Sequence, residues 1–253
     1  QIVYTGDFKF DQTATADFQT DFGRLGEIGK KGVFALLSDS TGAESVTENA
    51  SELQIADMVD EMFKYHTGRI IVASVASNIM RIQQVLNAAA KSNRKVLLTG
   101  RDLAKIVRTA LKLNYLTLPE PDLLIQNKDL KKYAPEETVI LETGKTGEPL
   151  TSLQKMATNH HRLIKIEQGD LVFIATTPSF AMETNVAKTS DLIYRAGGEV
   201  KEMKRSIKSS GHANKRDLQL MINLLKPKFL VPVQGEYRLL ANQIGRASCR
   251  ERV

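Results

Sequence analysis

The chain alternates short, continuously apolar segments with longer segments whose apolar residues recur at three- and four-residue steps. The short segments have the length and composition of β-strands, and the longer ones have the periodicity of amphipathic helices. Strands that are apolar along their whole length are usually covered on both faces, as in a parallel sheet between helix layers. The alternation therefore predicts an α/β fold with a parallel sheet.

The individual elements follow from the same patterns. Strands are expected in QIVYTGDF, GVFALLSDST, RIIVASVASN, KVLLTG, TVILETG and LVFIATT. Helices are expected over residues 53–65, 102–113, 150–157 and 185–196, and after Asn78, where Ile79, Ile82, Val85 and Leu86 share one face. Residues 114–137, with three prolines and many charges, are expected to be a surface excursion outside the core.

The composition is that of a globular protein, with 42% hydrophobic and 25% charged residues. No apolar run approaches the roughly 20 residues of a membrane helix, and the first residues lack the layout of a signal peptide. The single cysteine, Cys249, lies in a terminal segment of different character, so the rest of the chain has no disulfide. These features predict a cytoplasmic protein without a membrane partner.

Both ends of the sequence are expected to be cut. Residues 244–253 break the preceding pattern and are expected to be a non-native tail. Without the three arginines and one glutamate of this tail, the formal charge falls from +6 to about +4. A charge of that size permits RNA binding without arguing for it. The other end opens inside an apolar strand, without a starting Met.

The loops that follow the expected strands are the candidates for a functional site, because ligands of open α/β sheets bind beyond the carboxyl ends of the strands. These loops are GD, SDST, ASN, ETGKTGEP, TTPS and SSGHAN. Small and hydroxyl residues let backbone amides approach a phosphate closely, although each loop alone is equally well a simple turn. Lys145 does not have the spacing of a P-loop lysine.

Five segments follow one another over essentially all of residues 1–242: TGDFKFD, SDST, RIIVASVASNIMRIQQV, ETGKTGEP and SSGHANKRDLQLMINLLKPKFLVPVQGEYR. Their order resembles that of the motifs of ribonuclease J, the metallo-β-lactamase/β-CASP class of RNA-degrading enzymes. The resemblance implies a β-CASP domain, residues 66–225, inserted into a partial metallo-β-lactamase αβ/βα domain made of residues 1–65 and 226–243. It also implies a metal-dependent 5′-to-3′ exonuclease and endonuclease of RNA processing and mRNA decay.

The resemblance further implies a two-metal hydrolytic site, with zinc as the metal and manganese or magnesium as alternatives. It assigns Asp7 as the carboxylate that bridges the two ions; without the resemblance, Asp7 is more simply an acid in a tight turn. The family's other ligands come mainly from an HxHxDH motif and another histidine upstream of this sequence. The histidines present, His66, His160, His161 and His212, form no HxH pair. The fragment alone is therefore expected to be inactive.

One departure from the family pattern lies inside the chain. In PVQGEYR, Gln234 stands where active members have a metal-binding histidine, and an amide oxygen is a poor zinc ligand beside imidazole. This resembles the second, degenerate ribonuclease J paralogue of Gram-positive bacteria. Two functions stay open: a feeble hydrolase, or a non-catalytic RNA-binding subunit in a homo- or hetero-oligomer with a ribonuclease J paralogue. A small-molecule metallo-hydrolase such as a lactonase is disfavoured, because it has no use for β-CASP loops.

The resemblance assigns catalysis to Asp39 and His212, with the acid orienting a histidine that protonates the leaving oxygen. Without it, His212 is only a residue at a helix start. Contacts to single-stranded RNA are assigned to Ala76, Ser77 and Asn78 and to Lys208, Ser209, Ser210, Gly211 and His212. Met80 and Lys208 replace histidines that are common in the family, so selectivity for the RNA 5′ end is not implied. The basic segments KEMKRSIK and NKRD either flank an RNA channel or are solvated surface.

Overall fold

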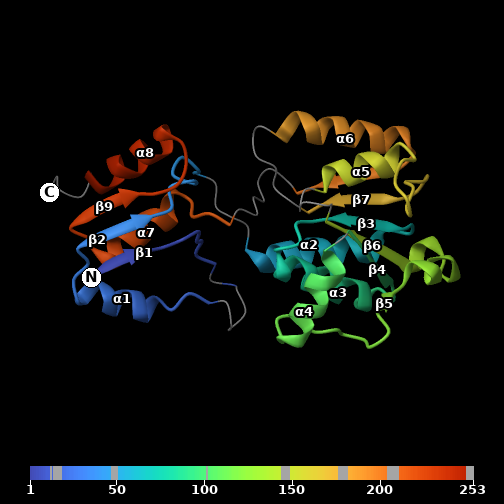
Figure 1. Ribbon diagram of the computed structural model, residues 1–253, viewed down its shortest axis with the longest axis horizontal. Helices are drawn as coiled ribbons and strands as arrows, with labels where there is room; N and C mark the ends of the chain where they lie inside the picture. Colours follow the sequence, from blue (N-terminus) through green and yellow to red (C-terminus); the bar gives the residue numbers. More distant parts are fainter. Residues whose placement is uncertain are drawn as a thin grey trace. The chain divides into compact units, whose positions relative to one another are not determined.

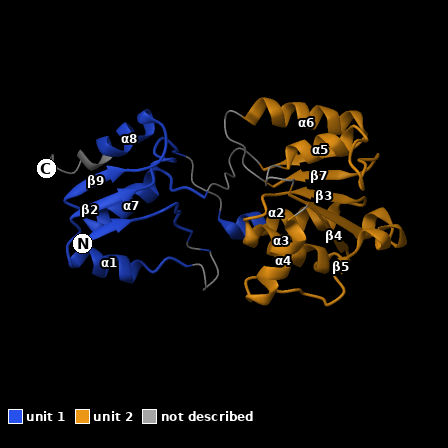
Figure 2. Ribbon diagram, viewed as in Figure 1, with its two compact units in different colours: residues 1–55, 204–253 blue, residues 56–203 orange. Residues whose placement is uncertain are grey.

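The computed structural model describes residues 1–253 except 12, 14–18, 47–50, 101, 144–148, 176–181, 204–210 and 249–253 (Figure 1). The chain forms two compact units (Figure 2): unit 1 combines residues 1–55 with 204–253, and unit 2 is the continuous segment 56–203. Each unit contains a sheet whose paired strands all run parallel. The predicted α/β fold with parallel sheets is confirmed.

Unit 2 is built on a six-stranded sheet with the order β5-β4-β6-β3-β7-β8. The strands are β3 (Ile70–Ala73), β4 (Lys95–Thr99), β5 (Leu124–Ile125), β6 (Thr138–Glu142), β7 (Leu171–Ile174) and β8 (Glu199–Glu202). The helices are α3 (Ile79–Lys91), α4 (Leu103–Lys112), α5 (Leu150–Ala157) and α6 (Glu183–Arg195). Helix α2 (Glu52–Tyr65) begins in unit 1 and continues into unit 2.

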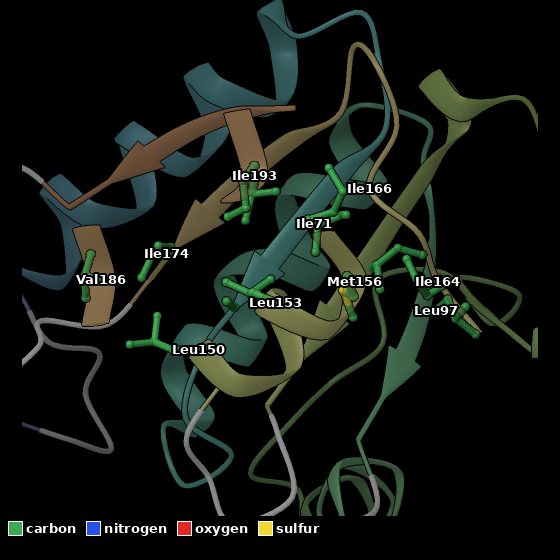
Figure 3. Close-up of a cluster of buried hydrophobic side chains, with 13 residues drawn as sticks. Ile71, Leu97, Leu150, Leu153, Met156, Ile164, Ile166, Ile174, Val186 and Ile193 are labelled. Atoms are coloured by element: carbon green, nitrogen blue, oxygen red, sulfur yellow. The ribbon is translucent and has the colours of Figure 1, made fainter. Parts of the chain in front are cut away.

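Both faces of the central strands are buried, as their continuous apolar sequences predict. Every residue of β3, β6 and β7 is buried. On one face, Ile71 and Ile174 pack with Leu153 of α5 and Ile193 of α6 (Figure 3). The connections β3-to-β4 and β6-to-β7 cross the sheet in opposite directions, and right-handed crossovers then require α3 and α5 on opposite faces.

The expectation for residues 114–137 was wrong in part. The segment contributes β5 to the edge of the sheet and two short 3₁₀ helices, η2 (Asn127–Lys132) and η3 (Pro135–Glu137). Leu116 and Leu123 are buried. Prolines and charges dominate the exposed positions of this segment, so its two isolated core leucines form no periodic pattern.

Unit 1 is built on a three-stranded sheet with the order β1-β2-β9. The strands are β1 (Ile2–Tyr4), β2 (Ala35–Ser38) and β9 (Phe229–Pro232), and the helices are α1 (Phe22–Lys30), α7 (Lys215–Leu225) and α8 (Tyr237–Ser248). Strand β9, from the far end of the sequence, pairs along the full length of β2. Unit 1 is therefore built from two segments, one before unit 2 in the sequence and one after it.

The two faces of the unit 1 sheet differ. Leu36 packs with Met221, Ile222 and Leu225 of α7 on the covered face. On the other face, large apolar side chains of β1 and β9 remain exposed: Ile2, Tyr4, Phe229 and Val231. The prediction of two-sided coverage is thus correct for unit 2 and wrong for unit 1.

The boundaries of the two compact units differ from the boundaries of the predicted domains. Helix α7, expected within residues 66–225, belongs to unit 1 because Met221, Ile222 and Leu225 pack with Leu36. Helix α8 continues to Ser248, into the residues expected to be a non-native tail. The assignment of family domains to residue ranges stays a prediction. Within the described ranges, no helix is long and apolar enough to cross a membrane.

Candidate functional site

The carboxyl ends of the unit 1 strands bring several predicted site residues together. Asp7 follows β1, Asp39 directly follows β2, and Gln234 follows β9. Because the three strands are parallel neighbours, the loops after them lie at the same edge of the sheet. His212 reaches this edge from the segment that leads into α7.

Asp39 and His212 are joined by a hydrogen bond of 2.8 Å between His212 Nδ1 and Asp39 Oδ2. The Asp39 side chain is 1% exposed and the His212 side chain 31%. An ionised carboxylate only accepts hydrogen bonds, so Nδ1 carries a proton and Nε2 is the ring atom that gains or loses one. The arrangement therefore suits proton transfer at Nε2.

The backbone and carboxylate of Asp39 are held from several sides. Its N–H donates to Thr5 Oγ1 over 3.1 Å, and its Oδ1 accepts the N–H of Thr41 over 2.9 Å. Its carbonyl oxygen accepts from Gln243 Nε2 over 3.1 Å. With Oδ2 bound to His212, the carboxylate has a fixed direction, which in turn fixes the plane of the imidazole.

Gln243, on α8, is a site residue that sequence reasoning missed. Its fully buried side chain donates from Nε2 to Ser38 Oγ over 2.8 Å and to the Asp39 carbonyl oxygen. Among the described residues its Oε1 has no hydrogen-bond partner. The amide must point its nitrogen at Asp39, because a carbonyl oxygen accepts only. No motif marks this glutamine, which lies just before the segment expected to be a tail.

Two variants of Gln243 separate the contribution of its packing to stability from that of its hydrogen bonds. Gln243→Met removes both bonds together with the unpaired oxygen, so we expect a free energy of unfolding equal to or above that of the wild type. Gln243→Glu places an acceptor against the Asp39 carbonyl and should cost about 1–3 kcal/mol. Urea denaturation of both variants measures this. A Glu variant as stable as the wild type would show that the contact with Asp39 is absent.

The segments that carry Asp39 and His212 meet through their backbones at Gly42. A Cβ on Gly42 would lie 2.0 Å from the carbonyl oxygen of Ala213, the residue after His212. Three residues beyond Gly42, the carbonyl oxygen of Ser45 accepts the Lys215 N–H over 3.0 Å. Only glycine permits so close an approach.

The loop that carries Asp7 is anchored next to it. Lys9 Nζ forms an ion pair of 2.8 Å with the largely buried Glu52 carboxylate. Asp11 Oδ2 accepts the Glu52 N–H over 2.9 Å, at the start of α2. Burial raises the pKa of Asp11. Hydrogen bonds, first among them the one from the Glu52 N–H, lower it by more, so the pKa of Asp11 lies below its ordinary value. Asp7 itself is exposed and open to a ligand.

Asp7, Asp39 and His212 form a candidate metal-binding group. Each offers one ligand atom, and these atoms lie within 4.8 Å of one another. Carboxylate and imidazole are ligand types for zinc and for manganese. Three ligands fit one divalent cation, whereas a two-metal site needs more than this group provides.

The other histidines belong to unit 2 and have local partners. His66 Nε2 lies 3.0 Å from the carbonyl oxygen of Gly169. His160 contacts Thr158, and His161 accepts the backbone N–H of Ile164. None of the three joins the Asp7 group in the part of the chain that the structure describes.

Gln234 lies beside the Asp39 loop, where its backbone carbonyl accepts a hydrogen bond from Ser40 Oγ. Its Oε1 is buried and has no hydrogen-bond partner within the described segments. An unpaired buried amide oxygen costs stability, typically about 1–3 kcal/mol. An oxygen ligand at this position suits harder ions such as manganese or magnesium better than zinc.

The remaining predicted site residues are distributed between the units. Ala76, Ser77 and Asn78 lie in unit 2 between β3 and α3, where Asn78 Oδ1 caps α3 by accepting the Arg81 N–H over 3.0 Å. Gly211 precedes His212 in unit 1. Lys208, Ser209 and Ser210 lie outside the described residues, as do residues 144–148 and 176–181.

Comparisons with known proteins agree with the motif order. The family model "Ribonuclease J, beta-CASP domain" matches residues 67–193, and the model "Zn-dependent metallo-hydrolase RNA specificity domain" matches residues 198–244. The chain is 55% identical to ribonuclease J 2 of Streptococcus pyogenes serotype M3, over 95% of this chain and 43% of that protein. It is 44% identical to ribonuclease J2 of Bacillus subtilis, over 94% of this chain and 43% of that protein. The chain thus spans less than half the length of these relatives.

Proposed function

The chain belongs to the ribonuclease J family, and on that premise we propose that the intact protein hydrolyses phosphodiester bonds of single-stranded RNA. We propose that it does so as a metal-dependent 5′-to-3′ exonuclease and endonuclease in RNA processing and mRNA decay. The observation that carries the proposal is the hydrogen bond from His212 to the buried Asp39 carboxylate, beside Asp7.

In the proposed reaction, His212 is the proton donor to the leaving oxygen. Its Nδ1–H is held by Asp39, which fixes the orientation of the ring and leaves Nε2 as the atom that would transfer the proton. Asp7 would hold the divalent cation, which neutralises phosphodiester charge and lowers the pKa of water when bound. The loop Ala76–Asn78 and the segment that ends at Gly211 are proposed to bind phosphates.

Gln234 favours a second function, that of a non-catalytic RNA-binding subunit. Without an imidazole at this position we expect weaker zinc binding, because an amide oxygen is a poorer zinc ligand than a histidine nitrogen. Such a subunit would support an active ribonuclease J paralogue in a hetero-oligomer. The retained Asp7, Asp39 and His212 favour the hydrolase instead, with low activity.

The test uses the full-length protein with 5′-monophosphorylated single-stranded RNA and either manganese or zinc. We expect slow degradation by the wild type and none by Asp7→Ala, because Asp7 is proposed to hold the cation. Gln234→His should raise the rate with zinc by about tenfold or more, by restoring an imidazole ligand. Asp57→Ala, which removes an exposed acid of α2, is the matched control and should behave as the wild type.

The outcomes separate the two functions. A wild type that binds RNA without cleaving it supports the subunit, and rescue by Gln234→His then identifies the missing ligand as the cause. A protein that neither binds nor cleaves RNA contradicts both functions.

A further inference from the structure

The solvent-facing side of α4 carries a row of cations. Lys105, Arg108 and Lys112 are all exposed, and their spacing of three and four residues places them on one side of the helix. The opposite side is buried through Leu103 and Val107. The row is therefore not part of the packing that holds α4 on unit 2.

No acidic group neutralises this row in the described part of the chain. No ion pair or side-chain hydrogen bond of these three residues is present there, and α4 itself contains no acid. The nearby Lys95 differs, because it pairs with Asp122 over 2.7 Å. The charge on α4 is thus open to a ligand.

The stability of α4 does not account for this arrangement. Like charges three and four residues apart repel each other along a helix. Lys105 lies in the first turn, where the helix dipole disfavours a cation, and Asp102 at the N-cap makes no side-chain capping bond. Only Lys112, in the last turn, is placed favourably for the helix.

An exposed aromatic ring stands at the end of the row. Helix α4 ends at Lys112, and Asn114, which follows the C-cap Leu113, has a left-handed φ of 60°. The N–H groups of Asn114 and Tyr115 donate to the carbonyl oxygens of Leu111 and Ala110 over 3.2 and 2.9 Å. In this type of helix end the second residue after the C-cap, here Tyr115, commonly packs against the last turn of the helix. Here Tyr115 is instead 62% exposed. Cations beside an open aromatic ring are the combination that binds single-stranded nucleic acid.

We propose that Lys105, Arg108, Lys112 and Tyr115 form a contact surface for single-stranded RNA, with phosphates on the cations and a base stacked on the ring. The proposal rests on RNA being the ligand, as the proposed function has it. Helix α4 follows the carboxyl end of β4, at the same edge of the sheet as the loop 76–78. An RNA strand bound at that edge can continue along α4.

The test measures the affinity of the 253-residue chain for a fluorescein-labelled single-stranded RNA by anisotropy, over a range of salt concentrations. In the triple variant Lys105→Gln, Arg108→Gln, Lys112→Gln, the slope of log affinity against log salt should fall by about 2, since each lost phosphate contact removes about 0.7. Affinity at low salt should fall on the order of tenfold. Tyr115→Ala should weaken binding about fivefold or more without changing the slope.

A second triple variant, made at other exposed cations of unit 2, removes the same charge as a control: Lys155→Gln, Arg162→Gln and Lys165→Gln. We expect its slope to stay near that of the wild type. Equal losses in both triple variants would reveal a general effect of charge and overturn the proposal, as would an unchanged α4 variant. If the wild type binds no RNA, RNA as the ligand of the proposed function is contradicted as well. If the wild type binds RNA and the α4 variant binds it equally well, only the α4 surface is contradicted. Circular dichroism checks that each variant is folded.

Discussion

Replacement of Gly42 by alanine is expected to lower the free energy of unfolding by about 1–3 kcal/mol and to move His212 away from Asp39. The added Cβ would lie 2.0 Å from the Ala213 carbonyl oxygen, so one of the two segments must shift. The φ of Gly42 is not left-handed, so alanine causes no backbone strain at this position. The contact with the Ala213 carbonyl oxygen is what disfavours alanine. The shift acts on Ala213, directly beside His212, and therefore on the 2.8 Å hydrogen bond to Asp39.

Urea denaturation and the NMR signal of the His212 Nδ1–H proton measure the two effects. Gly26→Ala is the matched control, because nothing lies within 4 Å of a Cβ at this position of α1. Alanine there should stabilise the helix by up to about 1 kcal/mol. A Gly42→Ala variant with wild-type stability and an unchanged His212 signal would refute the proposed close approach.

Asp39→Asn is expected to slow RNA cleavage by the full-length protein by about 10²- to 10⁴-fold, a loss typical of a misdirected acid–base histidine. The carboxylate accepts two hydrogen bonds, from the Thr41 N–H and from His212 Nδ1. An amide has only one oxygen, so with that oxygen on Thr41 its NH₂ group faces His212. Nδ1 must then accept, which moves the proton to Nε2 and gives the opposite tautomer.

The tautomer is read from ¹⁵N NMR of His212, and the rate from single-turnover cleavage. Glu44→Gln, in the same loop but exposed and paired with Arg238, controls for the loss of one negative charge. The double variant Asp39→Asn, His212→Ala should cleave RNA only slightly more slowly than the single variant His212→Ala, because the two residues act as a unit. Fully additive losses would argue that Asp39 acts independently of His212.

The sequence predicted those parts of the fold that depend on local patterns. Strands β3, β6 and β7 are buried on both faces, so their apolar runs were unambiguous. The loop SDST, which contains Asp39, was a candidate from the apolar run before it, because ligands of parallel sheets bind at the carboxyl ends of the strands. The catalytic role of Asp39 was predicted from the family resemblance. Its pairing with His212, 173 residues away, came only from the family resemblance.

Features that depend on tertiary contacts were missed. Helix α1 has the sequence FGRLGEIGK, in which three glycines weaken any helical pattern. The helix exists because Asp21 caps its start and because Gly29 allows close approach to the backbone of Leu224 in α7. Gln243 was missed for a similar reason, since its contact with Asp39 spans 204 residues.

The pairing of β2 with β9 has a consequence for the order in which the protein assembles on the ribosome. Unit 2 is one continuous segment, so its sheet can form while the rest of the chain is still being synthesised. Strands β1 and β2 are made before unit 2, but β2 cannot pair with β9 until β9 has emerged. His212 also emerges late and meets Asp39 only then. A nascent chain would therefore present the exposed cations of α4 before Asp39 and His212 can form their hydrogen bond.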